Sequence, residues 1–232
     1  MFIHTHRWIE KGKGVSGDMS PQTCLIFAAG EWCSMEVIHD HLAQKPNVLA
    51  CDGALTTCLD NGIVPEGVVG DMDSVDGDVL ERFVSLGGEV HERKEQDAHD
   101  LAKALALAGE QGHSSCIVIG ATGGDREHEW ANLLSCAATS MDIQCVGEVH
   151  VHRFLLPERT YSIEIGLGQN FSLFAVPTAE GITLSGAQYG LENEALSMGS
   201  RGLHNVATSS TLQVHFTEGR LMLLMRRPSS RA

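Results

Sequence analysis

The feature that most constrains the fold of this chain is a change of pattern near residue 147. From Cys24 to that point, short apolar runs alternate with segments of helical periodicity. Beyond it the helical periodicity fades, and short apolar segments are separated by glycine, proline, asparagine and glutamate. The sequence therefore predicts an α/β domain over residues 1–147, followed by a β domain over residues 148–232.

In the first domain the apolar runs have the length of buried strands, and the segments between them have the periodicity of helices. The predicted strands are 24–29, 48–51, 67–70, 89–91, 116–119 and 143–146. The predicted helices are 35–43, 55–59, 78–86, 97–108 and 127–138. This alternation is typical of a doubly wound, mostly parallel sheet with helices on both faces. Residues 1–21 are expected to form a mobile lead-in.

The second domain has the pattern of short antiparallel strands. They are expected at 149–155, 161–165, 171–175, 181–184, 212–216 and 221–225. Turn-forming residues separate these segments, which favours a small antiparallel β-sandwich.

Charge and composition exclude several classes of protein. The formal net charge of −14 disfavours binding to nucleic acid, whose phosphates an acidic surface repels. No apolar run approaches the length of a membrane span. The seven cysteines form no Cys-x-x-Cys pair, which fits a reducing, cytoplasmic compartment. The first residues lack the apolar stretch of a signal peptide, so none is expected.

Carboxylates follow the predicted strands at the edge where a doubly wound sheet binds its ligands. Asp52 follows the strand 48–51, and Asp71 and Asp73 follow the strand 67–70. Residues two apart on an extended chain point the same way, and two hard oxygen ligands suit Mg²⁺ beside phosphate oxygens. The alternative is a polar turn, since aspartate is common in turns.

Asp97 and Asp100 lie at the start of the helix predicted over 97–108. Asp97 has two equally favoured roles, as the N-cap of that helix or as a site residue, and with Asp97 as the cap Asp100 completes an arrangement like a capping box. Asp100 is the better candidate for chemistry, because a carboxylate in the first turn can extend over the strand ends.

A glycine-rich turn, residues 120–124, joins a predicted strand to a predicted helix. Such turns present backbone N–H groups to phosphate, and Arg126 and His128 add further donors. On its own this signal is weak, and a tight turn is the alternative, because neither a Walker A loop nor a Gly-x-Gly-x-x-Gly motif is present. Trp130 is expected in the core.

Taken together and in order, these motifs resemble those of the thiamine pyrophosphokinase family over most of the chain. The Gly-Asp-x-Asp-Ser signature of the family is matched by residues 70–74. Residues 96–100, followed by Lys103-Ala104-Leu105, resemble Gln-Asp-x-Thr-Asp with its downstream Lys-Ala-Leu. Further similar blocks are Asp52-Gly53-Ala54, residues 120–132, Gly186-Ala187-Gln188-Tyr189 and Leu203-His204-Asn205.

The resemblance implies transfer of diphosphate from ATP to the hydroxyl of thiamine, with release of AMP, on an α/β domain followed by a β-sandwich. It implies that Asp71, Asp73 and Asp100 hold Mg²⁺ and orient the hydroxyl. The nucleotide-binding residues implied are Asp52, Gln96, Asp97, Gly123, Gly124, Arg126, His128 and Asn132. The substrate-binding residues implied are Tyr189, His204 and Asn205. A homodimer, with substrate bound where the subunits meet, is also implied.

Several residues depart from the family pattern. His99 stands at the position of a threonine, Asp125 at that of an arginine, and Glu127 at that of an aspartate. His204 stands where the family has serine. These departures leave open two alternatives, a pyrophosphokinase for another small alcohol such as a hydroxymethylpterin, and a nucleotide- or thiamine-binding protein without turnover.

Overall fold

The computed structural model describes residues 23–95 and 97–227. The chain divides into two compact units, and the division falls between Phe154 and Leu155. The first unit contains the described helices and strands up to Val146 and all but the last residue of the strand His150–Leu155. The second unit contains the strands from Thr160 onward.

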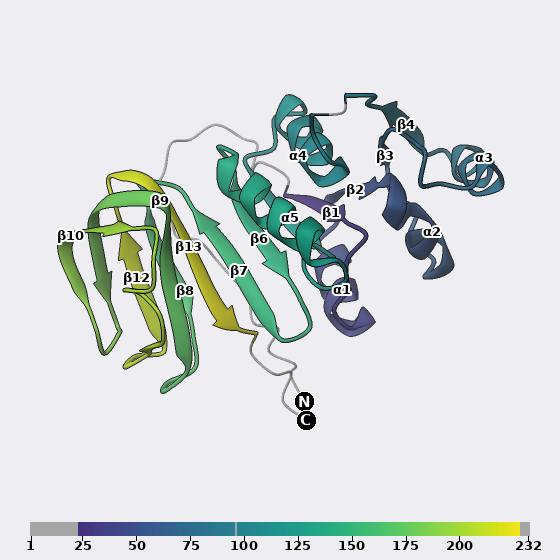
Figure 1. Cartoon of the computed structure of the whole chain (residues 1–232). Helices are drawn as coiled ribbons and strands as arrows, with labels where there is room; N and C mark the ends of the chain where they lie inside the picture. The colour runs from purple at the N-terminus through teal and green to yellow at the C-terminus, as the bar shows by residue number, and fades with distance from the viewer. Residues whose placement is uncertain (1–22, 96, 228–232) are drawn as a thin grey trace, which may run out of the picture. The chain divides into compact units, whose positions relative to one another are not determined.

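The first unit is built on a mostly parallel sheet (Figure 1). Its parallel strands, in the order in which they lie, are β4 (Glu89–Glu92), β3 (Gly67–Gly70), β2 (Asn47–Cys51), β1 (Cys24–Phe27), β5 (Ser115–Ile119) and β6 (Asp142–Val146). The antiparallel strand β7 (His150–Leu155) pairs with β6. All residues of β1 and β3 are buried, as expected for parallel strands covered on both faces. This confirms the predicted fold class.

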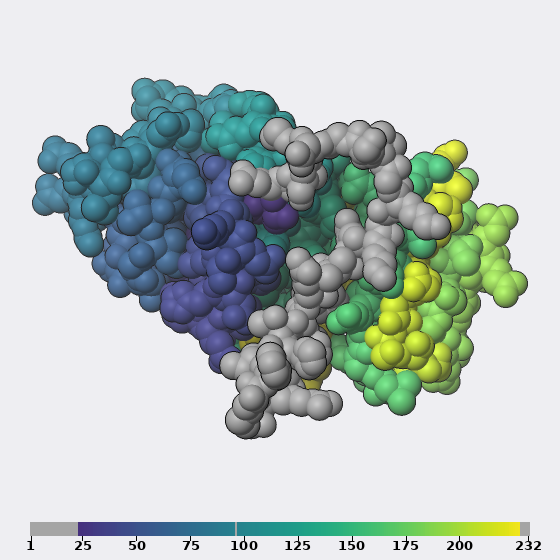
Figure 2. Space-filling model, turned by 180° about the vertical axis from the view of Figure 1, so that it is seen from behind, coloured from purple at the N-terminus to yellow at the C-terminus, as the bar shows by residue number. Residues whose placement is uncertain are grey.

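Helices cover both faces of this sheet. On one face lie α1 (Met35–Leu42), α2 (Asp52–Asp60) and α3 (Gly77–Ser85), whose apolar side chains form two clusters with β1, β2 and β3. Helices α1 and α2 form much of the surface in Figure 2, in purple and blue. The other face carries α4 (Asp100–Glu110) and α5 (Arg126–Ala138), which pack against each other.

The alternation of side chains along β6 shows that α1 and α5 lie on opposite faces of the sheet. Val146 belongs to the apolar cluster beneath α1 and α2, whereas the Sγ atom of Cys145 lies 3.6 Å from that of Cys136 in α5. Successive residues of a strand point to opposite faces, which places α5 across the sheet from α1. Within the described ranges, no helix combines the length and the apolar character that a membrane span needs.

One predicted helix begins later than the sequence suggests. Helix α4 starts at Asp100, and its N-cap is His99, so Asp97 does not cap it. The extended backbone of His99 and the hydrogen bond from Lys103 N to His99 O set this start. Helix α2, by contrast, starts three residues earlier than predicted and includes Asp52.

The second unit is antiparallel throughout its named pairs. Its strands are β8 (Thr160–Glu164), β9 (Asn170–Ser185), β10 (Leu191–Ser197), β11 (Asn205–Val206), β12 (Thr211–His215) and β13 (Glu218–Arg226). Strand β9 is central, because β10, β11, β12 and β13 all pair with it. The inward side chains of these strands form one apolar core.

Two strands predicted at 171–175 and 181–184 are a single strand, β9. The segment between them stays extended because neighbours pair across it. Ala179 is fully buried and lies opposite Gly219 of β13 and Leu196 of β10. Strand β10 was not predicted, because most of its residues are exposed and its apolar residues do not alternate.

Candidate active site

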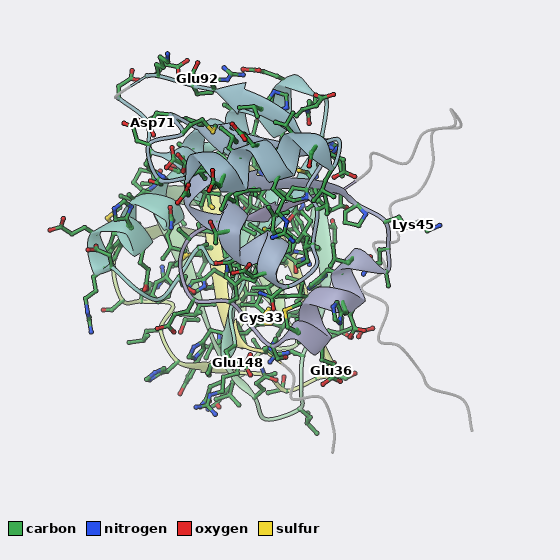
Figure 3. All side chains as sticks on the ribbon, turned by 90° about the vertical axis from the view of Figure 1, so that its right-hand side faces the viewer. Cys33, Glu36, Lys45, Asp71, Glu92 and Glu148 are labelled. Carbon is green, nitrogen blue, oxygen red and sulfur yellow. The ribbon has the colours of Figure 1, made fainter. Side chains whose placement is uncertain are left out.

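Three carboxylates from distant parts of the sequence meet at the carboxyl ends of β2 and β3. Asp52 is the first residue of α2, Asp71 follows β3, and Asp100 is the first residue of α4. One oxygen of each lies within 4.8 Å of the others. Figure 3 labels Asp71 at this edge, with Lys45, which precedes β2, at the opposite edge of the sheet. We call Asp52, Asp71 and Asp100 the acidic corner.

The local backbone holds Asp52 in this place. Its side chain accepts hydrogen bonds from Gly53 N at 2.6 Å and from Met72 N at 3.1 Å. A Cβ atom on Gly70 would lie only 2.5 Å from the Cγ atom of Asp52. Glycine at position 70 therefore allows the buried carboxylate of Asp52 to pack against the end of β3.

The acidic corner carries more negative charge than its surroundings balance. Burial, and then the carboxylates of Asp100 and Asp71, raise the pKa of Asp52 to about 6, against the opposing hydrogen bond from Gly53 N–H. The ammonium of Lys103, whose side chain is 5% exposed, lies 3.2 Å from Asp100 Oδ1. Lys103 balances one of the charges, and the remaining oxygens suit a hard divalent cation such as Mg²⁺.

The acidic corner differs in one member from the trio predicted to bind metal. The structure brings Asp71 and Asp100 together with Asp52, whereas Asp73 lies outside the group. Asp73 is exposed, and its backbone N–H donates to Asp71 Oδ1 at 3.2 Å. Asp97 is exposed, and Gln96 lies outside the described residues.

The glycine loop, residues 120–124, is fixed by its neighbours. The carbonyl groups of Gly120 and Thr122 accept hydrogen bonds of 2.9 Å from Gly30 N and Glu31 N, in the loop after β1. Asn132 of α5 is buried, and its Nδ2 donates to Ala121 O at 2.9 Å. Asn132 therefore ties α5 to the glycine loop.

The chain's own carboxylates already occupy donors expected to face a phosphate. Gly123 N donates to Glu129 Oε2 at 3.0 Å. Asp125 is the N-cap of α5, where its Oδ1 accepts hydrogen bonds from His128 N and Glu127 N, and these bonds lower the pKa of Asp125. Gly124, Arg126 and His128 are exposed at the start of α5 and remain accessible to a ligand.

Two side chains near this helix lie in unexpected places. Burial lowers the pKa of His99, whose Nε2 is 2.9 Å from Ser135 Oγ of α5. Trp130 is 66% exposed, so its predicted core position is wrong. Asn132 and Cys136 are the buried residues of α5, and Trp130 lies roughly 200° around the helix from Asn132.

In the second unit, Asn205 holds the loop that carries Tyr189. Asn205 Oδ1 accepts hydrogen bonds from Tyr189 N and Val206 N, and its Nδ2 donates to Tyr189 O at 2.7 Å. Asn205 is buried, whereas Tyr189 is 64% exposed and His204 is exposed. Tyr189 thus presents its ring from a loop fixed by Asn205.

Sequence reasoning missed two residues of these sites. Lys103 was noted only within a motif, although a lysine three residues after Asp100 on a helix is placed to pair with it. Glu129 carried no signal, because its role depends on how α5 packs beside the glycine loop.

Comparison with protein families gives a match to each unit of the chain. The model described as "Thiamin pyrophosphokinase, catalytic domain" matches residues 38–146. The model described as "Thiamin pyrophosphokinase, vitamin B1 binding domain" matches residues 156–221. The two matched segments follow each other in the order of the two structural units.

Individual relatives agree with these matches. A thiamine pyrophosphokinase from Bacillus subtilis is 30% identical over 159 residues, which cover 66% of this chain and 73% of that protein. Thiamine pyrophosphokinase 1 from Oryza sativa subsp. japonica is 29% identical over 166 residues, covering 65% of this chain and 62% of that protein. The crystal structure of a thiamin pyrophosphokinase from Geobacillus thermodenitrificans is similar with a TM-score of 0.72 and 28% identity, covering 90% of this chain and 99% of that one.

Proposed function

Because this chain belongs to the thiamine pyrophosphokinase family, we propose that it transfers diphosphate from ATP to the hydroxyl of thiamine. The products are thiamine diphosphate and AMP. The observation that carries this proposal is the acidic corner, which lies within the segment matched by the catalytic-domain model. The match to a vitamin B1 binding domain favours thiamine over a pterin as the acceptor.

The transfer needs one bond to form and one to break. The hydroxyl oxygen of thiamine attacks the β-phosphorus of ATP, and the bond from that phosphorus to the oxygen bridging to the α-phosphorus breaks. AMP leaves with the bridging oxygen. The hydroxyl proton passes to one of the two partly exposed carboxylates of the acidic corner, Asp71 or Asp100.

The proposed cofactor is Mg²⁺, held by Asp71 and Asp100 with the buried Asp52 behind them. The residues fit this ion, because three carboxylate oxygens converge, and burial together with their repulsion raises the pKa of Asp52. Bound there, Mg²⁺ would neutralise charge on the transferred phosphates. Asp73, exposed beside Asp71, is proposed to contact the ion through water.

Other residues are proposed to bind the two substrates. Arg126 and His128, exposed at the start of α5, offer donors to the phosphates of ATP. The exposed ring of Tyr189 suits the positive charge of thiamine, since an aromatic face attracts a cation. The set proposed to line the two substrates also includes Gln96, Asp97, Gly123, Gly124, Asn132, His204 and Asn205.

We also propose that the protein is a homodimer in a reducing compartment, the cytoplasm. Exposed apolar side chains on the second unit, including Tyr189, Met198 and Leu203, support an interface there. All seven cysteines are buried and none is in a disulfide in the described part of the chain, as suits a reducing compartment. Light scattering coupled to gel filtration measures the assembly, and a monomer at micromolar concentration would contradict the homodimer.

The proposed activity is tested by incubating the purified protein with ATP, Mg²⁺ and thiamine. We expect AMP and thiamine diphosphate to appear together in equal amounts. The same assay with EDTA in place of Mg²⁺, or with a hydroxymethylpterin in place of thiamine, should give neither product. Formation of AMP with the pterin alone, or tight binding of ATP and thiamine without any AMP, would contradict the proposal.

A further inference from the structure

The side chain of His99 bonds to a different helix from the one that His99 begins. It occupies the N-cap of α4, yet its side chain makes no capping hydrogen bond to that helix. The imidazole instead reaches α5, where Nε2 lies 2.9 Å from Ser135 Oγ and a further hydrogen bond involves the backbone of Ala131. One half-buried side chain therefore holds the start of α4 against the middle of α5.

The two helices carry different parts of the proposed site. The start of α4 supplies Asp100 to the acidic corner, and Lys103 one turn later pairs with it. Helix α5 begins beside the glycine loop, to which Asn132 ties it. Asn132 lies between Ala131 and Ser135, the two contacts of His99, so the same stretch of α5 contacts both the loop and His99.

From this arrangement we propose that His99 is a positioning residue, which sets the carboxylate of Asp100 relative to the glycine loop by fixing α4 on α5. Asp100 follows His99 directly, so a movement of the His99 backbone moves Asp100 with it. The effect of this role on catalysis rests on the proposed function.

The test changes Ser135 as well as His99. His99 is next to Asp100 in the chain, so a substitution at His99 alone could disturb Asp100 directly. His99→Ala removes both hydrogen bonds from this side chain to α5, whereas Ser135→Ala removes the bond to Ser135 and leaves the bond to the Ala131 backbone. His99→Gln keeps a hydrogen-bonding group near the position of Nε2. His39→Ala, at an exposed site on α1, is the matched control.

Binding of Mn²⁺, followed by electron paramagnetic resonance without substrates, gives a readout that does not depend on turnover. We expect the Kd for Mn²⁺ to rise about three- to tenfold in His99→Ala and by a smaller factor, about two- to threefold, in Ser135→Ala. The double variant should be no worse than His99→Ala alone, since His99→Ala already removes the bond to Ser135. His99→Gln should regain most of the affinity, and His39→Ala should match the unmodified chain.

Turnover with ATP and thiamine gives the second readout. The kcat value should fall about as much as metal affinity does, whereas the KM for thiamine should not change. If the unmodified chain binds Mn²⁺ but makes no AMP, the proposed function fails while the Mn²⁺ series still tests His99. A His99→Ala protein with lowered thermal stability but an unchanged Kd for Mn²⁺ would overturn the proposal.

Discussion

The acidic corner and the glycine loop lie at the carboxyl ends of strands in one parallel sheet, but their polar groups are in opposite states. In the acidic corner, three carboxylates face one another, and burial together with their repulsion raises the pKa of Asp52. In the glycine loop, Gly123 N is already paired with Glu129, and at the adjoining start of α5 the N–H groups of Glu127 and His128 are paired with Asp125. One region has charge left for a ligand to neutralise, whereas in the other the chain's own carboxylates accept hydrogen bonds from three backbone N–H groups.

This difference shows which kind of sequence signal is informative about binding. A glycine-rich turn before a helix predicts the backbone conformation, and Gly120, Gly123 and Gly124 do adopt positive φ angles. It does not predict whether the N–H groups are free, because a nearby carboxylate can occupy them. Unbalanced charge among buried groups is costly to the folded chain, so its presence points to a ligand.

The largest effect on turnover is expected from removing the charge of Asp71. This carboxylate is partly exposed and belongs to the acidic corner. Asp71→Asn should lower turnover about a thousandfold, since a metal ligand supplies several kcal/mol of transition-state stabilisation. The metal-free variant should be no less stable than the unmodified chain, because one of three repelling charges is gone. Steady-state kinetics and thermal unfolding in EDTA measure both effects.

A matched control for that variant is Asp60→Asn, at the exposed end of α2. It removes the same charge from the same unit and should leave turnover and Mg²⁺ dependence unchanged. If Asp71→Asn kept more than a tenth of normal turnover, Asp71 would not be a metal ligand, and the contrast between the two regions would lose its main support.

The second effect concerns stability and follows from the raised pKa of Asp52. Its folded-state pKa is about 6, above an ordinary value near 3.8, so the folded chain holds this proton more tightly. The stabilisation is therefore fully present below about pH 4 and is lost as the pH rises through about 6. We expect a loss on the order of 1 to 3 kcal/mol in the free energy of unfolding of the metal-free protein.

Denaturant unfolding in EDTA at pH 4.5 and 7.5 measures this loss, with Asp52→Asn as the comparison. The variant has no carboxyl group at this position to titrate, so its stability should fall less between the two pH values. Mg²⁺ at pH 7.5 should restore more stability to the unmodified chain than to the variant. Equal pH dependence in the two proteins would show that burial and the neighbouring carboxylates do not raise the pKa of Asp52 as inferred.

How much the sequence predicts depends on how far apart the interacting residues lie along the chain. Strand β3 has the bounds predicted for it, because its apolar run is ended by the acidic motif, and the doubly wound sheet follows from the alternation of elements. The presence of Asp52 beside Asp71 and Asp100 needs the packing of β2 on β3. The occupation of Gly123 N by Glu129 needs the position of α5. Neither appears in any local pattern.

The smallest effect is expected at the glycine loop and would show whether its own carboxylates hinder ATP. Asp125→Ser keeps an oxygen to cap α5 but removes a negative charge at the helix start, where anions are otherwise favoured. The KM for ATP should fall about two- to fivefold with kcat unchanged, and the difference should shrink at high salt, which screens exposed charges.

Asp76→Ser is the control for that substitution, because Asp76 caps α3 in the same way, with its Oδ1 accepting from Asp78 N at 3.1 Å. It should leave the KM for ATP unchanged, since the start of α3 has no proposed contact with the nucleotide. An increase in KM for Asp125→Ser would mean that this carboxylate itself helps to bind the nucleotide. In that case the glycine loop would be a second place where ligand charge is recognised, and its satisfied hydrogen bonds would have to open when ATP binds.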